Sequence, residues 1–570
     1  MKVNPNQTKY SYMLENNKNH MNYTALSFGD RVITYEELHD RIQKYARILT
    51  KKGIKKGDVI AVNALNTPES VFLLYALDII GAIVVGLNPF EKKEKIKLDL
   101  EMTRPKYVIT TDLSYSTVKD YEKALDFSSI LYSPVESIDD IKIRFGYKVM
   151  QLLKGNFKLN RDSNLMRIIN STNADDVVLN FNSYENGDLT DIMFTGGSTG
   201  THKGVDLSGP GLNSVIEGMK YIYDDDFFEG QTYLGNIPFG HMTYGRCILH
   251  VALTNNMNYA LTLKAMPEDF YDEIVRTNAY AAVGGPPHWQ SLIKKTDNGF
   301  EISDKLKKNS LTNLHLATSG GEAKKREQNN AINKALEFCG SPTVLGDGLG
   351  ATEAWSVVSL NSGNLYKDDT IGVPISTLDY KLIDPLTGEE VEKGNKGLLY
   401  ISGDTVMLGY HNNQEETDKV ISYDENGKKW CNLGDYLQED NGYLKYIGRQ
   451  KRNHVCGVEN IYPEQLEEVL NAIPEIRETV VTFVPDDELQ YTPVYHISLN
   501  DEHTIDTQLL EKKIRKTVLS QFSESWLPSH INYYNEPLKR MINTKLDIGF
   551  YQNIDEENNN YKEKPKVLKK

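Results

Sequence analysis

The chain alternates between amphipathic helical patterns and short apolar runs, and this alternation constrains its fold more than any other feature. Residues 34–52 place apolar side chains three and four positions apart, which predicts a helix with Thr34 as its N-cap and Glu37 three residues on. Apolar runs at 58–64 and 106–111 have the length and composition of buried strands. Helices that alternate with apolar strands indicate a layered α/β fold.

The longest apolar run, residues 71–87, approaches the length of a membrane span. Asp78 and Gly81 interrupt it, so we interpret it as a buried helix followed by a buried strand at 82–86. The N-terminus has no apolar signal segment, and the four cysteines are isolated, as is typical of reduced thiols in the cytoplasm. We therefore expect a cytoplasmic protein with no transmembrane segment.

The size and charge of the chain exclude some classes of protein. It has 570 residues, of which 39% are hydrophobic, so the bulk of it is not disordered. At roughly 150 residues per domain, this length corresponds to about four compact units, or to fewer and larger ones. The formal net charge of −15 argues against sequence-independent binding to nucleic acid, which requires a basic surface.

A domain boundary is predicted near Gly448. A strand pattern precedes it, a short charged stretch at 449–452 follows it, and a new amphipathic pattern starts at Pro463. The end of the chain is charged and rich in asparagine, which is typical of disorder. The expected units are a large N-terminal domain at 1–447, a small C-terminal domain at 448–550 and a disordered tail at 551–570.

Residues 191–205, DIMFTGGSTGTHKGV, form the most informative stretch of the chain. An apolar strand pattern runs into a loop rich in glycines and hydroxyls that ends on a lysine. Glycines let backbone N–H groups approach an anion, hydroxyls add donors and the lysine supplies positive charge, so the loop predicts a polyphosphate site. The residues of this site are Thr195, Gly196, Gly197, Ser198, Thr199, Gly200 and Lys203.

Two other motifs compete for this loop. A Walker A loop requires G-x-x-x-x-G-K-[ST], but Lys203 lies between His202 and Gly204, so that motif fails. Residues 196–200 do match the G-x-S-x-G of a nucleophile elbow. In an elbow the serine leads directly into a helix, whereas here the helical pattern resumes only near Leu212. A serine hydrolase is therefore the minor alternative.

The segment TGGSTGTHKGV resembles the phosphate-binding signature of the adenylate-forming superfamily, which comprises acyl-CoA synthetases, luciferases and the adenylation domains of nonribosomal peptide synthetases. Its TGG opening is most similar to the fatty-acyl-CoA synthetase version, and His202 stands where the superfamily most often has proline. The resemblance implies a large N-terminal domain of layered α/β subdomains and a small, mobile α+β domain.

Further segments resemble the superfamily in its own order. IPFGHMTYG at 237–245 resembles the second core motif, which implies that the His241 ring lines the carboxylate site and orients the acid. Residues 284–287 and 319–322 resemble segments that wall the acyl pocket and the adenine site. The implied nucleotide contacts are Gly320, Gly321 and Glu322. The expected walls of an apolar acid pocket are Gly284, Gly285, Ala317 and Gly320.

LGDGLGATEAW at 345–355 supports two interpretations. It contains G-x-G-x-x-A after an apolar run, as dinucleotide sites do, but no convincing βαβ unit surrounds it. It also resembles the superfamily's G-x-T-E, which implies that Thr352 contacts the α-phosphate and that Glu353 holds Mg²⁺. The other implied nucleotide contacts are Asp347, Gly348 and Leu349. Leu349 replaces an aromatic residue that usually stacks on adenine.

WCNLGD at 430–435 resembles the ribose site of the superfamily. The resemblance implies that Asp435 accepts hydrogen bonds from both ribose hydroxyls and that Arg449 also reaches the ribose. It makes Lys451 the pivot between the two domains.

PLKRMINTKLD at 537–547 resembles the C-terminal lysine motif. Its spacing and the following Leu-Asp favour Lys545, rather than Lys539, as the catalytic lysine. The resemblance then implies a two-step reaction. ATP and a carboxylic acid form acyl-AMP and pyrophosphate, and the acyl group passes to a thiol. The residues with implied catalytic roles are Lys545, His241, Thr352 and Glu353.

The acid and the thiol are less constrained than the reaction. Amino-acid-activating relatives carry an Asp near the second motif, and 237–245 contains none, which favours a fatty or aromatic acid. Coenzyme A is the first choice of acceptor, and the phosphopantetheine arm of a carrier protein is the alternative. A further alternative is a protein that binds a nucleotide without turning it over, because the chain departs from the superfamily motifs at Leu349, Leu433, Val458 and Thr544.

Overall fold

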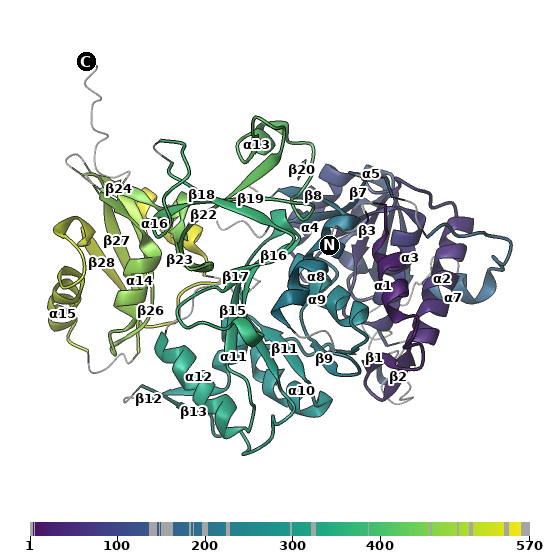
Figure 1. Ribbon diagram of the computed structural model, residues 1–570, viewed down its shortest axis with the longest axis horizontal. Helices are drawn as coiled ribbons and strands as arrows, with labels where there is room; N and C mark the ends of the chain where they lie inside the picture. The colour runs from purple at the N-terminus through teal and green to yellow at the C-terminus, as the bar shows by residue number, and fades with distance from the viewer. Residues whose placement is uncertain are drawn as a thin grey trace.

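A computed structural model describes most of the chain. The described residues are 4, 6–135, 145–147, 149, 164–181, 184–185, 187–195, 203–223, 228–296, 299–320, 326–385, 387–456, 459–486, 489–500, 505–540 and 546–559. They form a mixed α/β structure with several separate sheets (Figure 1), so the predicted fold class is confirmed.

The first large sheet has seven strands in the order β20-β8-β7-β4-β3-β5-β6. Strands β7, β4, β3, β5 and β6 run parallel to one another, and β8 and β20 extend the sheet in antiparallel fashion. The strands are β3 (Val59–Asn63), β4 (Ile83–Gly86), β5 (Tyr107–Thr111), β6 (Ser128–Tyr132), β7 (Leu189–Phe194), β8 (Gly204–Ser208) and β20 (Gly409–Tyr410).

The second large sheet has nine strands in the order β17-β16-β15-β14-β11-β9-β10-β1-β2. They are β1 (Thr24–Phe28), β2 (Arg31–Thr34), β9 (Thr232–Gly235), β10 (Asn258–Leu261), β11 (Ala281–Gly284), β14 (Leu316–Ser319), β15 (Leu345–Ala351), β16 (Ser356–Asn361) and β17 (Val373–Pro374). A separate hairpin pairs β12 (Ile293–Thr296) with β13 (Gly299–Ile302).

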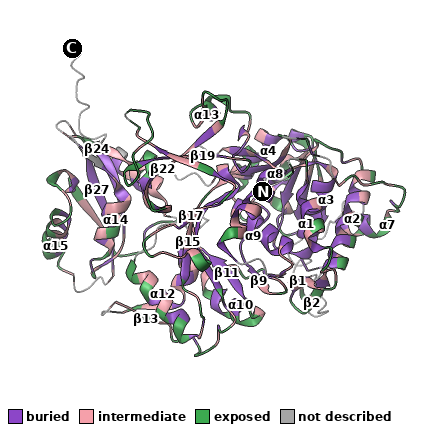
Figure 2. Ribbon diagram, in the orientation of Figure 1, coloured by how far each residue is buried: buried purple, intermediate pink, exposed green. Residues whose placement is uncertain are grey.

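Helices and both large sheets share one continuous hydrophobic core. Buried side chains of α1, α2, α3, α8 and α9 belong to the same hydrophobic cluster as residues of both large sheets, and Figure 2 shows how thoroughly these helices are buried. The helices of this part are α1 (Lys9–Asn17), α2 (Tyr35–Lys51), α3 (Pro68–Ile80), α4 (Lys93–Thr103), α5 (Glu122–Leu125), α7 (Leu165–Ser171), α8 (Gly209–Met219), α9 (Thr243–Thr254), α10 (Phe270–Thr277), α11 (Pro286–Gln290) and α12 (Arg326–Phe338).

The local patterns at the start of the chain fold as predicted. Helix α2 begins after Thr34, whose hydroxyl accepts a hydrogen bond from the Glu37 N–H at 3.2 Å. The apolar run becomes the buried helix α3, a left-handed C-cap at Gly81 (φ 76°) and the buried strand β4. Within the described part of the chain, no helix has the length and apolar character needed to cross a bilayer.

The remainder forms smaller sheets. Five strands, β18 (Asp379–Ile383), β19 (Lys396–Ser402), β21 (Ile421–Tyr423), β22 (Lys429–Asp440) and β23 (Tyr443–Arg449), make one sheet beside α13 (Gln414–Asp418). Then come the pair β24 (His454–Cys456) and β25 (Glu459–Ile461) and the sheet of β26 (Ile476–Asp486), β27 (Gln490–Leu499) and β28 (His530–Tyr534). Helices α14 (Pro463–Asn471) and α15 (Thr507–Leu519) accompany them at the left of Figure 1.

The chain after Gly448 has a hydrophobic cluster of its own. It gathers residues from β24 to the turn after α15, including Cys456, Leu466 and Trp526, and it shares no buried member with the main core. A separate core is what an independent domain requires. The boundary at 447/448 itself stays a prediction.

The structure differs from the expected disorder at the start of the tail. Residues 548–559 form helix α16 (Ile548–Asn559). Tyr551 and Asp555, one turn apart, are both buried. The Asp555 carboxylate accepts a hydrogen bond from Thr482 on β26 and lies 2.8 Å from His496 Nε2 on β27. The polar composition predicted a solvated, disordered segment. Instead, hydrogen bonds to buried polar side chains hold one face of this helix against the sheet. Residues 560–570 lie outside the described chain.

Candidate active site

The glycine-rich loop connects two antiparallel strands. Strand β7 leads into it and β8 leaves it, with Phe194 opposite Gly204, and the Thr195 N–H donates to the Lys203 carbonyl at 3.0 Å. Residues 196–202 between them, which include the predicted phosphate contacts Gly196, Gly197, Ser198, Thr199 and Gly200, lie outside the described chain.

Helix α8 begins only after β8, at Gly209, with Ser208 as its N-cap. It therefore starts slightly before Leu212, where the sequence pattern placed it. A strand separates the loop from this helix, whereas a nucleophile elbow has its serine at a direct strand-to-helix turn. The topology argues against the serine hydrolase.

Lys203 joins the loop to two distant segments. Its ammonium pairs with Glu416 of α13 and lies 4.4 Å from the centre of the Tyr410 ring. The Tyr410 hydroxyl donates to Glu353 Oε1 at 2.9 Å. Burial and the neighbouring Glu353 carboxylate raise the pKa of Tyr410, so the phenol keeps its proton and acts as the donor. One tyrosine thus places the loop lysine and the Glu353 carboxylate on a common site.

Thr352 and Glu353 lie in the tight turn η6 (Thr352–Ala354) between β15 and β16. Trp355 closes this turn in the left-handed region (φ 52°), and its indole N–H donates to the Ser208 carbonyl at the end of β8. The Met407 N–H donates to the Glu353 carbonyl at 2.8 Å. A left-handed tryptophan is conformationally costly, and burial of its ring holds it in place.

The same turn rules out a dinucleotide fold for G-x-G-x-x-A. Strand β15 contains the whole motif, from Gly346 to Ala351, and pairs antiparallel with β16. A dinucleotide-binding turn instead leads from a strand into a helix whose N-terminus faces the pyrophosphate.

Asp435 and Arg449 form a cross-strand pair. They lie opposite each other on β22 and β23, and Arg449 Nη1 donates to Asp435 Oδ2 at 3.2 Å and to the Leu433 carbonyl at 2.8 Å. Burial raises the pKa of Asp435, Arg449 opposes this rise and the negative charge of Glu353 adds to it, and the result is a pKa of about 6. Two predicted ribose contacts therefore lie together, electrostatically close to Glu353.

His241 follows β9 in a loop that packs tightly on the first sheet. A side chain on Gly86 of β4 would meet the Gly240 carbonyl oxygen at 2.6 Å, so only glycine permits this approach. Burial lowers the pKa of His241 to about 4, so the ring is neutral at physiological pH. Its Nδ1 is buried and has no hydrogen-bond partner among the described residues. A neutral ring with a spare nitrogen suits the proposed carboxylate contact.

A buried ion network supports this loop. Arg246 on α9 donates to the Phe239 carbonyl at 2.8 Å and to the Gly240 carbonyl at 3.2 Å, and it pairs with Asp191 of β7 at 2.9 Å. Lys9 of α1 also pairs with Asp191. Burial favours a raised pKa for Asp191, but Lys9 and Arg246 outweigh it and hold the pKa below its ordinary value. The network ties the strand before the glycine-rich loop to the His241 loop.

The predicted adenine segments lie at neighbouring strand ends. Gly320 follows β14, and a Cβ on it would lie 3.8 Å from the Gly348 carbonyl oxygen of β15. The Gly348 N–H donates to Asp347 Oδ1 at 2.9 Å, and Leu349 packs partly buried against the main core. Gly320, Asp347, Gly348 and Leu349 are thus brought together. Gly321, Glu322 and Lys545 lie outside the described residues, as does the Lys451 side chain.

An apolar cavity of about 30 Å³ lies between α8, α9 and the second sheet, and its lining includes Tyr244, three residues after His241. Tyr244, Cys247, Val283, Leu316 and Thr318 are among its lining residues. The expected wall Ala317 points the other way, into the separate cluster that contains Phe270 and α12. A side chain on Gly284 would likewise meet His288 and Phe270 rather than the cavity. Alternate residues of a strand face opposite sides, so Val283, Leu316 and Thr318, and not Ala317, line this cavity.

Sequence reasoning missed three residues of the site: Tyr410, Glu416 and Arg246. Tyr410 ends the segment KGLLYISGDTVMLGY, so a search for aromatic residues near that segment would have found it. Glu416 and Arg246 carry no local signal, because each acts on a segment far away in the sequence.

Comparison with known proteins agrees with this geometry. The sequence profile described as AMP-binding enzyme matches residues 13–411, which is more than half of the chain. The chain belongs to the AMP-binding enzyme family. The match covers the glycine-rich loop, His241, Glu353 and Tyr410. It confirms the recognition of an adenylate-forming enzyme from sequence.

Relatives in this family are ligases. A long-chain-fatty-acid–CoA ligase of Bacillus subtilis is 26% identical over 89% of this chain and 88% of its own length. A probable 4-coumarate–CoA ligase 2 of Dictyostelium discoideum is 27% identical over 80% of this chain and 78% of its own length. The ATP-bound crystal structure of MatB from Rhodopseudomonas palustris has a TM-score of 0.77 at 19% identity, covering 96% of this chain and 98% of that one. The predicted enzyme class, an AMP-forming acid–thiol ligase, is confirmed.

Proposed function

We propose that this protein activates a fatty or aromatic carboxylic acid with ATP and transfers the acyl group to coenzyme A. In the first step a carboxylate oxygen attacks the α-phosphorus, the bond to the bridging oxygen breaks, and pyrophosphate leaves with the electron pair. In the second step a thiolate attacks the acyl carbon, and AMP leaves. The thiol proton passes to solvent.

The observation that carries this proposal is the line Lys203–Tyr410–Glu353. A lysine from a glycine-rich hairpin and a carboxylate from the G-x-T-E turn face the same tyrosine. This is the charge arrangement that a polyphosphate with a divalent cation requires, because the lysine neutralises phosphate and the carboxylate holds the metal.

The carboxylate of Glu353 fits Mg²⁺ chemically, since Mg²⁺ prefers oxygen ligands and is usually held by one or two carboxylates together with substrate phosphates. No cluster of three or more His, Cys, Asp or Glu side chains suited to a metal occurs among the residues that the structure describes, which agrees with a cation that arrives with the nucleotide. When bound, Mg²⁺ neutralises phosphate charge. Thr352 would contact the α-phosphate, and the hydroxyls and N–H groups from Thr195 onward would hold the β- and γ-phosphates.

The nucleoside would lie between two groups of residues. Asp435 and Arg449 would bind the ribose hydroxyls, and Gly320, Asp347, Gly348 and Leu349 would border the adenine. Gly321 and Glu322 would also contact the adenine. An aliphatic Leu349 covers the base without aromatic stacking.

An apolar acid suits the apolar cavity that Tyr244 and Cys247 line. Its lining is almost wholly hydrophobic and includes no acidic side chain that would pair with a substrate ammonium. The relatives named above act on long-chain fatty acids and on 4-coumarate, and both have an apolar body. The neutral His241 ring would orient the carboxylate.

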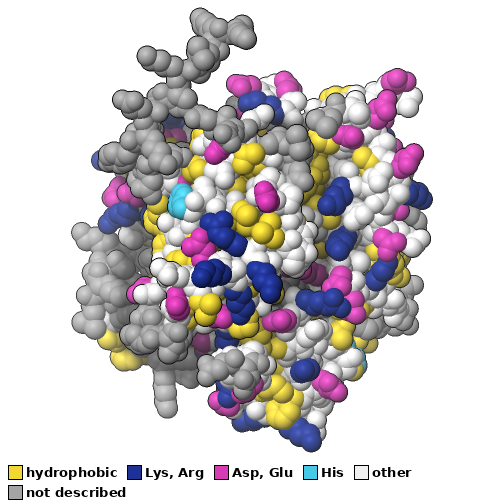
Figure 3. Space-filling view, turned by 90° about the vertical axis from the view of Figure 1, so that its left-hand side faces the viewer, with side chains coloured by type: hydrophobic (Ala, Val, Ile, Leu, Met, Phe, Trp, Pro, Cys, Tyr) yellow, Lys and Arg dark blue, Asp and Glu magenta, His cyan; other side chains and the backbone are white. Residues whose placement is uncertain are grey.

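The small C-terminal domain would act in both steps. We place Lys545 between the carboxylate and the α-phosphate, where its charge offsets their mutual repulsion. Rotation of 448–550 about Lys451 would then remove Lys545 and admit the thiol. The face of the molecule on the C-terminal side carries Lys and Arg side chains gathered near its centre (Figure 3), which suits the phosphates of coenzyme A. A carrier-protein phosphopantetheine arm ends in the same thiol and is the second candidate. A cytoplasmic location stays a prediction.

The proposal is tested by product analysis. The full-length protein is incubated with magnesium, ATP, a panel of fatty, aryl and amino acids, and either coenzyme A or a loaded carrier protein. We expect AMP to form only when an acid is present and an acyl-CoA thioester to accumulate. ATP binding without AMP formation would favour a non-catalytic nucleotide-binding protein. Ester cleavage without ATP would favour a hydrolase.

A further inference from the structure

A second cavity adjoins the proposed acid pocket. Its volume is about 230 Å³, and it lies between α1, α8 and α9. The two cavities share four lining residues: Met219, Tyr223, Phe228 and Val251. We call the two spaces the inner and the outer cavity and the four shared residues the neck.

The neck is apolar and adjustable. The Tyr223 and Phe228 rings pack edge to face with centroids 5.0 Å apart, and Met219 has a flexible, unbranched side chain that adapts its packing to what lies beside it. The inner cavity as it stands has room for little more than a water molecule. An acyl chain that enters it must displace neck side chains, and that displacement joins the inner cavity to the outer one.

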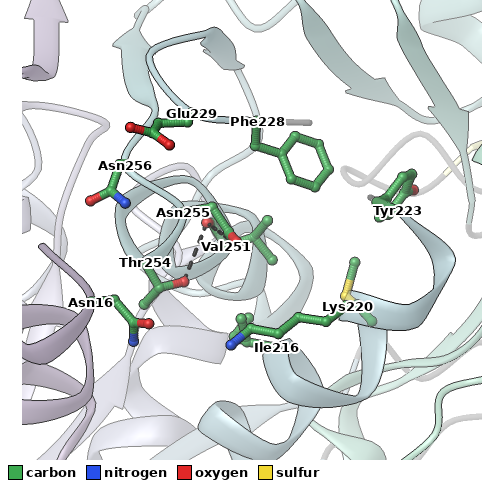
Figure 4. Close-up of a pocket in the computed structure, with 11 residues that line it drawn as sticks. Asn16, Ile216, Lys220, Tyr223, Phe228, Glu229, Val251, Thr254, Asn255 and Asn256 are labelled. Carbon is green, nitrogen blue, oxygen red and sulfur yellow. Dashed lines mark hydrogen bonds between the residues drawn. The ribbon is translucent and has the colours of Figure 1, made fainter. Parts of the chain in front are cut away.

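The far side of the outer cavity is polar. Figure 4 shows Asn16, Glu229 and Asn256 on one side and the rings of Tyr223 and Phe228 on the opposite side. Along the two cavities the order is therefore Tyr244, which is three residues after His241, an apolar stretch, an aromatic neck and then a set of hydrogen-bonding groups.

The two charged side chains at the outer cavity, Lys220 and Glu229, have partners within the protein. Lys220 pairs with Glu217 at 2.7 Å, and Glu229 pairs with His20 at 2.5 Å when that histidine is protonated. Asn16 donates to the Tyr12 carbonyl, and Asn256 accepts from Asn17. Each amide has further donors or acceptors beyond that single bond. This chemistry suits a neutral hydroxyl or amide better than a second charge.

We propose that the substrate is a long amphipathic acid, with a carboxylate at one end, an apolar middle and a neutral hydrogen-bonding group at the other end that lodges in the outer cavity. This inference rests on the proposed function and names its substrate class. A site built to hydrogen-bond a substrate group discriminates strongly against the analogue that lacks it.

The test compares three acids by acid-dependent exchange of labelled pyrophosphate into ATP: butanoate, decanoate and the terminal hydroxy derivative of decanoate. We expect kcat/KM for the hydroxy acid to exceed that for decanoate by about tenfold or more. The variant Asn16→Trp fills the outer cavity and should lower kcat/KM for the hydroxy acid by about tenfold while leaving butanoate unchanged. Asn19→Trp, at an exposed position just beyond α1, is the matched control and should change neither.

Several results would overturn this inference. Equal kcat/KM for decanoate and its hydroxy derivative, loss of butanoate activity in Asn16→Trp, or activity with short acids alone would each do so. Calorimetric binding of the hydroxy acid without nucleotide separates the two levels of the argument. If that acid binds the wild type and not Asn16→Trp, but no acid supports exchange, the proposed function fails and the outer site stands.

Discussion

Arg246 donates to Asp191 at 2.9 Å, and both side chains are almost fully buried. The pair joins α9 to β7 and so connects the His241 loop with the strand that carries the glycine-rich loop. Lys9 from α1 adds a second cation to the same carboxylate. Removal of one member of a buried ion pair leaves an uncompensated charge, which is the costly case.

We therefore expect Asp191→Asn to lower the free energy of unfolding by about 3 kcal/mol or more, because Arg246 then lacks its carboxylate and Lys9 keeps only Asp78, 3.4 Å away. Urea denaturation measures this directly. Asp188→Asn is the control, since Asp188 pairs with Lys56 near the surface and exposed pairs contribute about 1 kcal/mol or less. Equal stability losses in both variants would show that the buried network has no special role.

Asp435 should give the proposed nucleotide site a pH dependence. Its pKa of about 6 means that it is ionised above that pH and protonated below it. Only the carboxylate accepts hydrogen bonds from both ribose hydroxyls, so KM for ATP should rise as pH falls through about 6. His241, with a pKa of about 4, stays neutral and adds no step near its ordinary pKa. Initial rates between pH 5 and 8 test this. In Asp435→Asn the change of KM near pH 6 should vanish, and KM for ATP should be raised over the whole pH range.

The same residue should reduce stability at neutral pH. The folded state binds the Asp435 proton more tightly than the unfolded chain does, so this contribution to stability is complete below about pH 4 and is lost as pH rises through about 6. Asp435→Asn should therefore raise the free energy of unfolding at pH 7 by up to about 3 kcal/mol, and by little at pH 4. Chemical denaturation at the two pH values measures the difference, and an equal effect at both would contradict the assignment.

We expect Glu416 to compete with phosphate for Lys203, with which it forms an ion pair. The hydrogen bond from Lys203, followed by that from Lys419, lowers the pKa of Glu416 to about 2, so it is always charged. Glu416→Gln should release Lys203 and remove a negative charge near the polyphosphate, lowering KM for ATP by about threefold. Lys203→Met should raise it. Steady-state kinetics in ATP decides the sign, and a raised KM in both variants would make Glu416 a support for Lys203 rather than a competitor.

Lys545 is predicted to act in the first step alone. Lys545→Ala should slow adenylate formation by about a thousandfold with little change in ATP binding, because it removes charge needed mainly in the transition state. Single-turnover formation of acyl-AMP measures this. Lys539→Ala is the matched control. The Lys539 ammonium lies 3.8 Å from the centre of the Phe550 ring and is half exposed, so its loss should leave the rate unchanged. Similar losses in both variants would refute the choice of Lys545.

Local patterns were enough to predict the early elements. The Thr34 cap and the helix after it depend on neighbours in sequence, and the structure forms them as expected. Asp435 and Arg449 were found through their motifs, and the antiparallel register of β22 and β23 explains why they meet. Where chemistry is carried by residues close in sequence, the sequence is informative.

Two kinds of structural feature were not predicted from the sequence. The Lys9–Asp191 pair joins residues 182 positions apart, and no local signal records such a contact. The orientation of Ala317 was missed for a different reason. Strand β14, Leu316–Ser319, is buried on both faces, so its sequence does not reveal which of its residues face the cavity. The helix at 548–559 was not predicted, because the segment is polar overall and only two of its side chains, Tyr551 and Asp555, are seen to be buried.

The most direct test of the central claim is exchange of labelled pyrophosphate into ATP. Exchange requires that an acid attack the α-phosphorus reversibly at a site that holds magnesium and pyrophosphate. We predict acid-dependent exchange in the full-length protein and its near-complete loss in Glu353→Gln. Absence of exchange with every fatty, aryl and amino acid supplied, in protein that still binds ATP, would contradict the account.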